Sequence, residues 1–223
     1  MSEQVRLTAA DGHEFEAYVA KPHGEPVAGL VVVQEIYGVN QHIRSVADSY
    51  AHDGFLAVAP ALFDRYERGV DLGYEGADAQ KARSLLSRLD IGAAVRDTAA
   101  ALDYPRLQTG KKSGVIGYCL GGTIAWLAAT RLNPDAAVGY YGGNIAKFAG
   151  EKPTCPVMLH FGRKDQHIPR EEVDKISAAH PEVDIYWYDA GHGVNCDARS
   201  SFDAESAKLA RVRSLEFLTK NLS

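Results

Sequence analysis

The segment 113–122, with the sequence SGVIGYCLGG, constrains the fold of this chain more than any other stretch. It begins as a short apolar strand, breaks at Gly117, places Cys119 at the bend and continues into an apolar helix over residues 120–131. A strand, a tight turn and a helix with small residues at Gly117 and Gly121 form the nucleophile-elbow pattern G-x-S-x-G, with cysteine in place of serine. The glycines are needed because the strand and the helix pass too close together for a Cβ atom. The pattern predicts that Cys119 is a nucleophile at the start of a helix.

Two other interpretations of this segment are a buried structural cysteine and a phosphate-binding turn. A cysteine in an apolar stretch is often a small buried hydrophobic residue, and glycine-rich turns between a strand and a helix also bind phosphate. The glycines at positions 114, 117, 121 and 122 do not form G-x-G-x-x-G, and no Lys-Ser or Lys-Thr pair follows them. Both nucleotide-binding fingerprints are therefore absent, and the elbow is the preferred interpretation.

The composition is that of a globular protein. With 223 residues, 46% hydrophobic and 24% charged, we expect a single α/β domain over 1–223 that can bury a sizeable core. The net charge of −5 provides no basic surface, so we expect no nucleic-acid partner. The first residues lack an apolar signal segment, and no run has membrane-spanning length, so we expect no membrane partner. Three cysteines without a C-x-x-C pair favour a reducing, cytoplasmic location.

Predicted strands and helices alternate along the chain. Apolar or alternating runs predict strands over 5–8, 14–19, 28–33, 55–59, 137–140, 157–161 and 183–188. Helical spacing predicts helices over 41–52, 77–88, 91–104, 170–180 and 204–220. The polar segment 62–76 is interpreted as a surface loop over the site. This order predicts an α/β-hydrolase fold, with a mostly parallel central sheet, helices on both faces and antiparallel pairs at one edge.

An acid and a base follow the elbow at the expected places. In an α/β-hydrolase sheet the nucleophile is followed by Asp or Glu and then by His, each after a later strand. Asp165 follows the strand over 157–161, and His192 follows the strand over 183–188. Taken alone, each residue is more often an ordinary loop side chain. Together with Cys119 they predict a triad in which His192 is the base and Asp165 orients its imidazole.

The end of the strand over 28–33 carries a further candidate. Glu35 lies where this apolar strand reaches the carboxyl edge of the sheet, a place where a carboxylate needs a partner. It could hydrogen-bond Cys119 or accept its proton, or else bond to nearby backbone. The backbone N–H groups of Ile36 and Leu120 are the predicted oxyanion-hole donors, since one follows this strand and the other follows the nucleophile.

With these residues in place, the chain resembles the dienelactone hydrolases, also called carboxymethylenebutenolidases. The shared residues are Asp11-Gly12, 34–40 (QEIYGVN), 117–122 (GYCLGG), 139–142 (GYYG), Asp165 and Gly191-His192. The resemblance implies a cofactor-free carboxylic ester hydrolase whose Cys119–His192–Asp165 triad attacks a small lactone or ester. It also implies that Glu35 keeps the thiol protonated until substrate binding moves it, which protects an idle thiolate from oxidation.

The resemblance fails at the substrate-binding arginines. The family holds the substrate carboxylate with two arginines, and here those positions fall on Cys196 and near Ala79, with Arg83 one helical turn later. Substrate carboxylate recognition by guanidinium groups is thus an open question. The candidate substrate-binding side chains are Tyr37, Arg83, Tyr141 and His160. His160 and Arg199 are two other possible anion ligands.

Alternatives of other classes remain. The same machinery could act on a bulkier or uncharged ester or thioester, or the chain could be a non-catalytic, redox-sensing or interaction member of the fold. His192, Cys196 and Asp197 match no zinc-binding spacing, so we expect no metal and no cofactor. We expect a monomer or a weak dimer.

Overall fold

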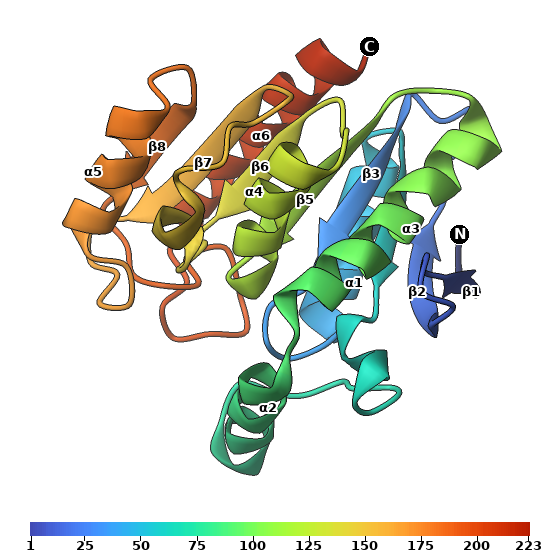
Figure 1. Ribbon diagram of the computed structural model, residues 1–223, viewed down its shortest axis with the longest axis horizontal. Helices are drawn as coiled ribbons and strands as arrows, with labels where there is room; N and C mark the ends of the chain where they lie inside the picture. The colour runs from blue at the N-terminus through green and yellow to red at the C-terminus, as the bar shows by residue number, and fades with distance from the viewer.

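The computed structural model describes all 223 residues, and one eight-stranded sheet runs through it (Figure 1). The strand order is β1-β2-β4-β3-β5-β6-β7-β8. The strands are β1(Ser2–Thr8), β2(Glu14–Ala20), β3(Ala28–Val33), β4(Phe55–Pro60), β5(Ser113–Tyr118), β6(Ala137–Tyr140), β7(Val157–Gly162) and β8(Asp184–Tyr188). β2 pairs antiparallel with β1 and β4, and all other neighbours are parallel. The prediction of a mostly parallel sheet with antiparallel pairs at one edge is confirmed.

Helices cover both faces of this sheet. They are α1(Gln41–His52), α2(Gly76–Arg88), α3(Ile91–Thr109), α4(Leu120–Arg131), α5(Arg170–Ala179) and α6(Ala204–Leu222). In Figure 1, α3, α4 and α5 lie on the viewer's side of the sheet, while α1 and α6 lie behind it. Every residue of β3, β4 and β5 is buried between these layers, which explains their unbroken apolar sequences.

The helix α3 extends five residues beyond its predicted end at Tyr104. It continues through Pro105 to Thr109, although proline lacks the N–H that a helix interior uses. Pro105 is buried against β3, where a Cβ atom built on Gly29 would lie 2.5 Å from its Cβ. The helix is therefore held by tertiary packing, which a local reading of proline as a helix terminator misses.

The segment 62–76, predicted as a surface loop over the site, contributes Tyr74 and Glu75 to the cleft described below but is not irregular throughout. It begins with the short 3-10 helix η1(Leu62–Arg65), whose Leu62 and Phe63 are buried. The carboxylate of Asp64 accepts hydrogen bonds from the backbone N–H of Glu16 and of Gly69. Asp71 then forms a β-bridge with Gly38. These contacts hold the segment against the sheet near the end of β3.

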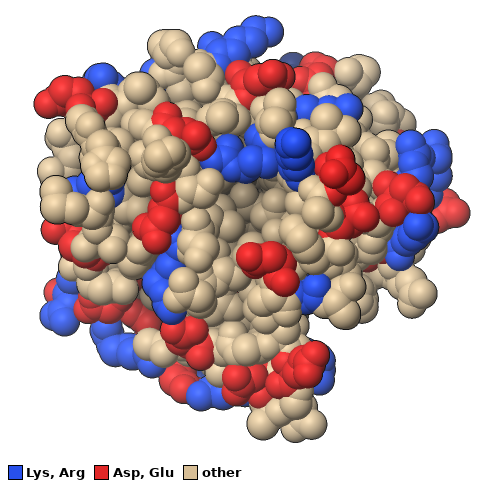
Figure 2. Space-filling model, turned by 180° about the vertical axis from the view of Figure 1, so that it is seen from behind, with Lys and Arg blue, Asp and Glu red and all other residues tan.

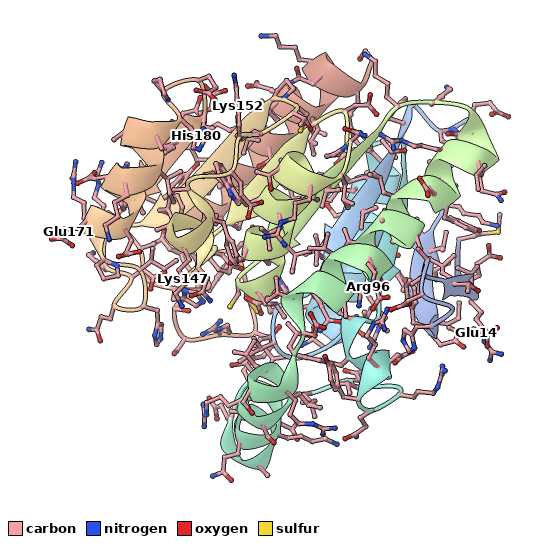
Figure 3. All side chains as sticks on the ribbon, in the orientation of Figure 1. Glu14, Arg96, Lys147, Lys152, Glu171 and His180 are labelled. Carbon is pink, nitrogen blue, oxygen red and sulfur yellow. The ribbon has the colours of Figure 1, made fainter.

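Charged side chains support this arrangement at the surface. Arg65 and Arg96 both pair with Asp11 in the β1–β2 turn, and Figure 3 labels Arg96 on α3. Arg65 also pairs with the buried Asp97. Figure 2 shows basic and acidic residues interspersed over the face behind Figure 1, without an extended basic patch on that face.

No helix of the protein combines the length and the apolarity needed to cross a membrane.

The carboxyl ends of the parallel strands meet along the lower edge of Figure 1, and α2 lies beyond that edge. In an open α/β sheet, ligand sites form at this edge, because the loops that follow the strands converge there.

Candidate active site

The turn after β5 has the backbone geometry of a nucleophile elbow. Cys119 has a φ of 54° and a ψ of −112°, and it directly precedes α4. A Cβ atom on Gly117 would lie 1.9 Å from the carbonyl oxygen of Gly121, and one on Gly121 would lie 2.2 Å from that of Val33. A non-glycine residue at positive φ is strained, and the surrounding contacts must hold it there. One such contact is the 3.0 Å hydrogen bond from the Cys119 N–H to the carbonyl of Tyr140.

Three side chains from separate loops line up at this turn. His192 Nε2 lies 3.2 Å from Cys119 Sγ, and His192 Nδ1 lies 2.7 Å from Asp165 Oδ2. The second oxygen of Asp165 accepts the backbone N–H of His167 at 2.8 Å, which fixes the carboxylate. The structure thus brings the three residues of the predicted triad into one hydrogen-bonded row.

The environment of His192 favours its protonated form. Burial by itself lowers the pKa of this imidazole, but the hydrogen bonds to Asp165 and Cys119 outweigh burial and raise the pKa to about 10. When protonated, the ring directs one N–H at the carboxylate and the other at the sulfur. Such a ring can hold negative charge on Cys119 and can later supply a proton.

The predicted oxyanion donors lie where β3 meets α4. The N–H of Gly121 donates to the carbonyl of Gln34 at 3.0 Å, which joins the two elements beside Ile36 and Leu120. The Gln34 side chain is fully buried, donating to the Glu35 carbonyl at 3.1 Å and accepting the Leu62 N–H at 3.1 Å. These two hydrogen bonds fix the Gln34 side chain between the end of β3 and η1, which its place in the shared segment 34–40 does not by itself reveal. The sequence signal for this placement is a glutamine that directly follows a buried apolar strand.

The surroundings of Glu35 differ from the expectation. Its carboxylate is buried, and neither oxygen makes a hydrogen bond, so the expected contact with Cys119 is not formed. The charge that faces it is the guanidinium of Arg199, whose Nη1 lies 3.5 Å from Oε1. The reason is that the Cys119 sulfur is engaged by His192, while Arg199 attracts the carboxylate on another side.

Arg199 is the cation that pairs with Glu35. Its side chain is 20% exposed and its guanidinium lies 5.8 Å from the centre of the Tyr74 ring. Burial by itself lowers the pKa of Arg199, but the surrounding groups, with Glu35 first among them, together outweigh burial and raise the pKa, so the guanidinium stays charged. Counting four residues beyond His192 leads to Cys196 and misses this arginine. Only the course of the loop 190–203 brings Arg199 back over the end of β3.

A cleft of about 370 Å³ opens beside the row formed by Cys119, His192 and Asp165. Most of its lining is polar, and it includes Tyr74, Lys164, Gln166, His167, His192 and Arg199. The charged side chains of this lining are Arg199, Lys164, which is paired with Asp189, and the acidic Glu75, and such a polar lining suits a small polar ligand.

Two predicted tyrosines lie next to this row. The ring of Tyr141 is 5.0 Å from that of His192, and its buried hydroxyl makes no hydrogen bond. The ring of Tyr37 is 4.4 Å from that of Tyr74, in the wall of the site. Their contact with substrate remains a prediction.

Two other predicted substrate ligands lie outside the cleft. His160 is buried within β7, where its ring nitrogens lie 2.8 Å from the Tyr188 hydroxyl and 2.9 Å from the Ser214 hydroxyl. The prediction that it binds substrate is wrong, because both nitrogens are used inside the protein. Arg83 is exposed on α2, forms no ion pair and does not line the cleft.

The sheet, the elbow and the three aligned side chains define an α/β-hydrolase fold with cysteine at the nucleophile position. The model of the dienelactone hydrolase family matches residues 15–222 of the chain. This protein belongs to the dienelactone hydrolase family and is a dienelactone hydrolase-like hydrolase.

Individual relatives agree with this assignment along almost the whole chain. The carboxymethylenebutenolidase of Pseudomonas putida is 34% identical over 227 residues, covering 98% of this chain and 96% of its own. Carboxymethylenebutenolidase 1 of Cupriavidus pinatubonensis is 31% identical, covering 98% and 97%.

Solved structures show the same fold. A Klebsiella pneumoniae protein provisionally called a dienelactone hydrolase superposes with a TM-score of 0.84 at 27% identity, covering 99% of each chain. A dienelactone hydrolase-like promiscuous phosphotriesterase from metagenomic libraries gives a TM-score of 0.78 at 20% identity, covering 100% of this chain and 99% of its own. At that identity the likeness concerns the fold alone.

Proposed function

We propose that the protein hydrolyses small lactones or esters with Cys119 as the nucleophile. The observation that carries this proposal is the row formed by Cys119 Sγ, His192 and Asp165, with separations of 3.2 and 2.7 Å. Nucleophile, base and orienting acid within hydrogen-bond reach are what covalent acyl transfer requires.

In the first step the Cys119 sulfur attacks the carbonyl carbon of the substrate, while its proton resides on His192. The carbonyl oxygen becomes an oxyanion, which the backbone N–H groups of Ile36 and Leu120 stabilise. The C–O bond then breaks, and His192 gives its proton to the departing oxygen. In a lactone this oxygen stays attached to the acyl group, so the ring opens while a thioester forms on Cys119.

In the second step a water molecule attacks the thioester. His192, now neutral, takes a proton from this water, and the oxyanion donors act again. When the C–S bond breaks, the acid is released and the proton on His192 is again shared with the sulfur. Asp165 holds the imidazole in the required orientation throughout.

Glu35 is proposed as a fourth member of this machinery. Its carboxylate is held by a single 3.5 Å ion pair with Arg199 and by no hydrogen bond, so it can turn without breaking a network. With Arg199 engaged by a substrate, Glu35 loses its counter-charge and can turn toward Cys119, which it does not contact in the free protein. This couples substrate binding to the state of Cys119.

The charge of the cleft supports an anionic substrate. Arg199 lines it, and although Lys164 there is paired with Asp189 at 2.8 Å, the relatives named carboxymethylenebutenolidases act on a lactone that carries a carboxymethylene group. We propose a small lactone with a carboxylate substituent, whose charge lies toward Arg199. A neutral ester is the competing substrate.

Steady-state kinetics on a dienelactone and on a neutral aryl ester test the proposal. We expect the wild type to prefer the dienelactone, Cys119→Ala to be inactive, and His192→Gln to lose about 10²–10⁴-fold in kcat/KM. Circular dichroism checks that each variant is folded. A folded wild type that turns over neither substrate contradicts the proposal and favours a non-catalytic member of the fold.

A further inference from the structure

A second cluster of chemically active side chains lies behind the catalytic row. His42 on α1 faces Cys196 and Asp197 in the loop that follows His192, and one ligand atom from each lies within 4.8 Å of the others. His42 and Cys196 are buried, whereas the side chain of Asp197 is 77% exposed. The proposed hydrolysis uses none of the three.

The ring of His42 has no adequate partner in the protein. Its Nδ1 atom, the ring nitrogen nearest to Asp197, lies 3.4 Å from Oδ1 of that residue, and its Nε2 atom, at another corner of the ring, is buried without a hydrogen bond. Buried polar atoms are nearly always hydrogen-bonded, and 3.4 Å is long for a hydrogen bond to nitrogen. By contrast, two ligand atoms on a tetrahedral metal with bonds of about 2.1 Å are separated by about 3.4 Å.

We propose that His42, Cys196 and Asp197 bind a divalent cation of the zinc type. Imidazole, thiolate and carboxylate are the three donor groups that zinc takes from proteins, and they suit Mg²⁺ and Ca²⁺ poorly. Three protein ligands leave a fourth position for water. On binding, a sulfur–metal bond forms and the proton of the Cys196 thiol passes to solvent.

The surroundings allow a cation to enter and allow its charge to be neutralised. A cavity of about 360 Å³ opens between α1 and α6 and is lined by His42 and Asp197, with the exposed Lys208 and with Arg211 also in its wall. The neighbouring Arg211 is paired with Asp53 and stacks on the ring of Tyr50 at 3.7 Å, so its charge is already compensated. One thiolate and one carboxylate then neutralise a divalent ion.

Because of where the cluster lies, a bound metal acts on the loop that carries His192. Cys196 and Asp197 lie in the loop 190–203, between His192 and Arg199. A metal held also by His42 ties this loop to α1. We therefore expect the bound metal to stabilise the loop that carries the catalytic base.

Cobalt(II) titration tests the site, because a thiolate bound to cobalt gives a charge-transfer absorption. The experiment uses the full chain with Cys119→Ser, since the active-site thiol could itself bind metal beside His192. We expect one cobalt per chain, its displacement by zinc, and a raised melting temperature. The signal should vanish when Cys196→Ser is added, and should persist with Cys155→Ser, which removes a thiol outside the cluster.

Two further variants separate ligation from folding. Asp197→Asn changes an exposed side chain, so the protein should fold as its parent does, as circular dichroism can check. We expect it and His42→Gln to weaken cobalt binding about tenfold or more. Absence of a thiolate–cobalt signal, or a signal that survives Cys196→Ser, overturns the proposal. Equal affinity in the Asp197→Asn protein overturns the role of that carboxylate.

Discussion

Arg199 provides the counter-charge for Glu35: its Nη1 lies 3.5 Å from a carboxylate that is buried and makes no hydrogen bond. Both side chains converge on the end of β3, from loops far apart in sequence. A buried carboxylate without other partners depends on this one cation, because desolvating an unpaired charge is costly. The stability of the site therefore depends on both charges of this ion pair being present.

Removing only one partner of this pair should destabilise the fold more than removing both. We expect Arg199→Met to lower the free energy of unfolding by about 1–3 kcal/mol, since it leaves the Glu35 charge uncompensated in the interior. The double variant Glu35→Gln/Arg199→Met should recover most of that loss, as urea unfolding can measure. Losses that simply add would mean that the two side chains do not interact.

Among the three cysteines, Cys119 should react first with iodoacetamide. Burial raises the pKa of Cys155 to about 12 and that of Cys196 to about 11, so at pH 7 only roughly 10⁻⁴ of either or less is thiolate. Cys119 is partly exposed and faces the imidazolium of His192. Peptide mass spectrometry over a time course measures the three rates. Comparable rates for all three thiols would contradict the assignment of Cys119 as the nucleophile.

The nucleophile elbow should not accept a methyl group at Gly117. Its Cβ would lie 1.9 Å from the Gly121 carbonyl oxygen, which is backbone and cannot rotate away. We expect Gly117→Ala to destabilise the protein by about 3 kcal/mol or more. Gly143→Ala is the matched control, because the nearest atom to its Cβ is 3.9 Å away, and it should change stability by less than about 0.5 kcal/mol. Similar chemical-denaturation midpoints for the two variants would argue against a close-packed elbow.

Acid should destabilise the protein partly through His160. Burial lowers the pKa of this imidazole from 6.5 to about 3, so the folded state keeps it neutral while the unfolded chain takes up a proton. Stability is therefore lost as the pH falls from 6.5 toward 3, with a slope of about 1.4 kcal/mol per pH unit from this group. His160→Asn does not titrate, and its unfolding free energy should depend less steeply on pH over that range. Identical slopes would mean that His160 is protonated in the folded state.

The sequence by itself determined the parts of this protein that local physics controls. Unbroken apolar runs predicted the central strands, because only a strand covered on both faces is apolar along its whole length. The glycines around Cys119 predicted the elbow, and the order of nucleophile, acid and base predicted that Asp165 and His192 would lie near Cys119, as they do. These inferences need only the spacing of residues and the rule that parallel strands share one carboxyl edge.

Only the tertiary structure decided which side chains meet. The ion pair of Arg199 with Glu35, the burial of His160 among hydroxyl groups and the approach of His42 to Cys196 depend on the paths of loops and on side-chain rotamers. The passage of α3 through Pro105 likewise depends on packing against β3. Such contacts join residues that are distant in the chain, and their energies come from burial and charge in the folded state, which local spacing does not encode.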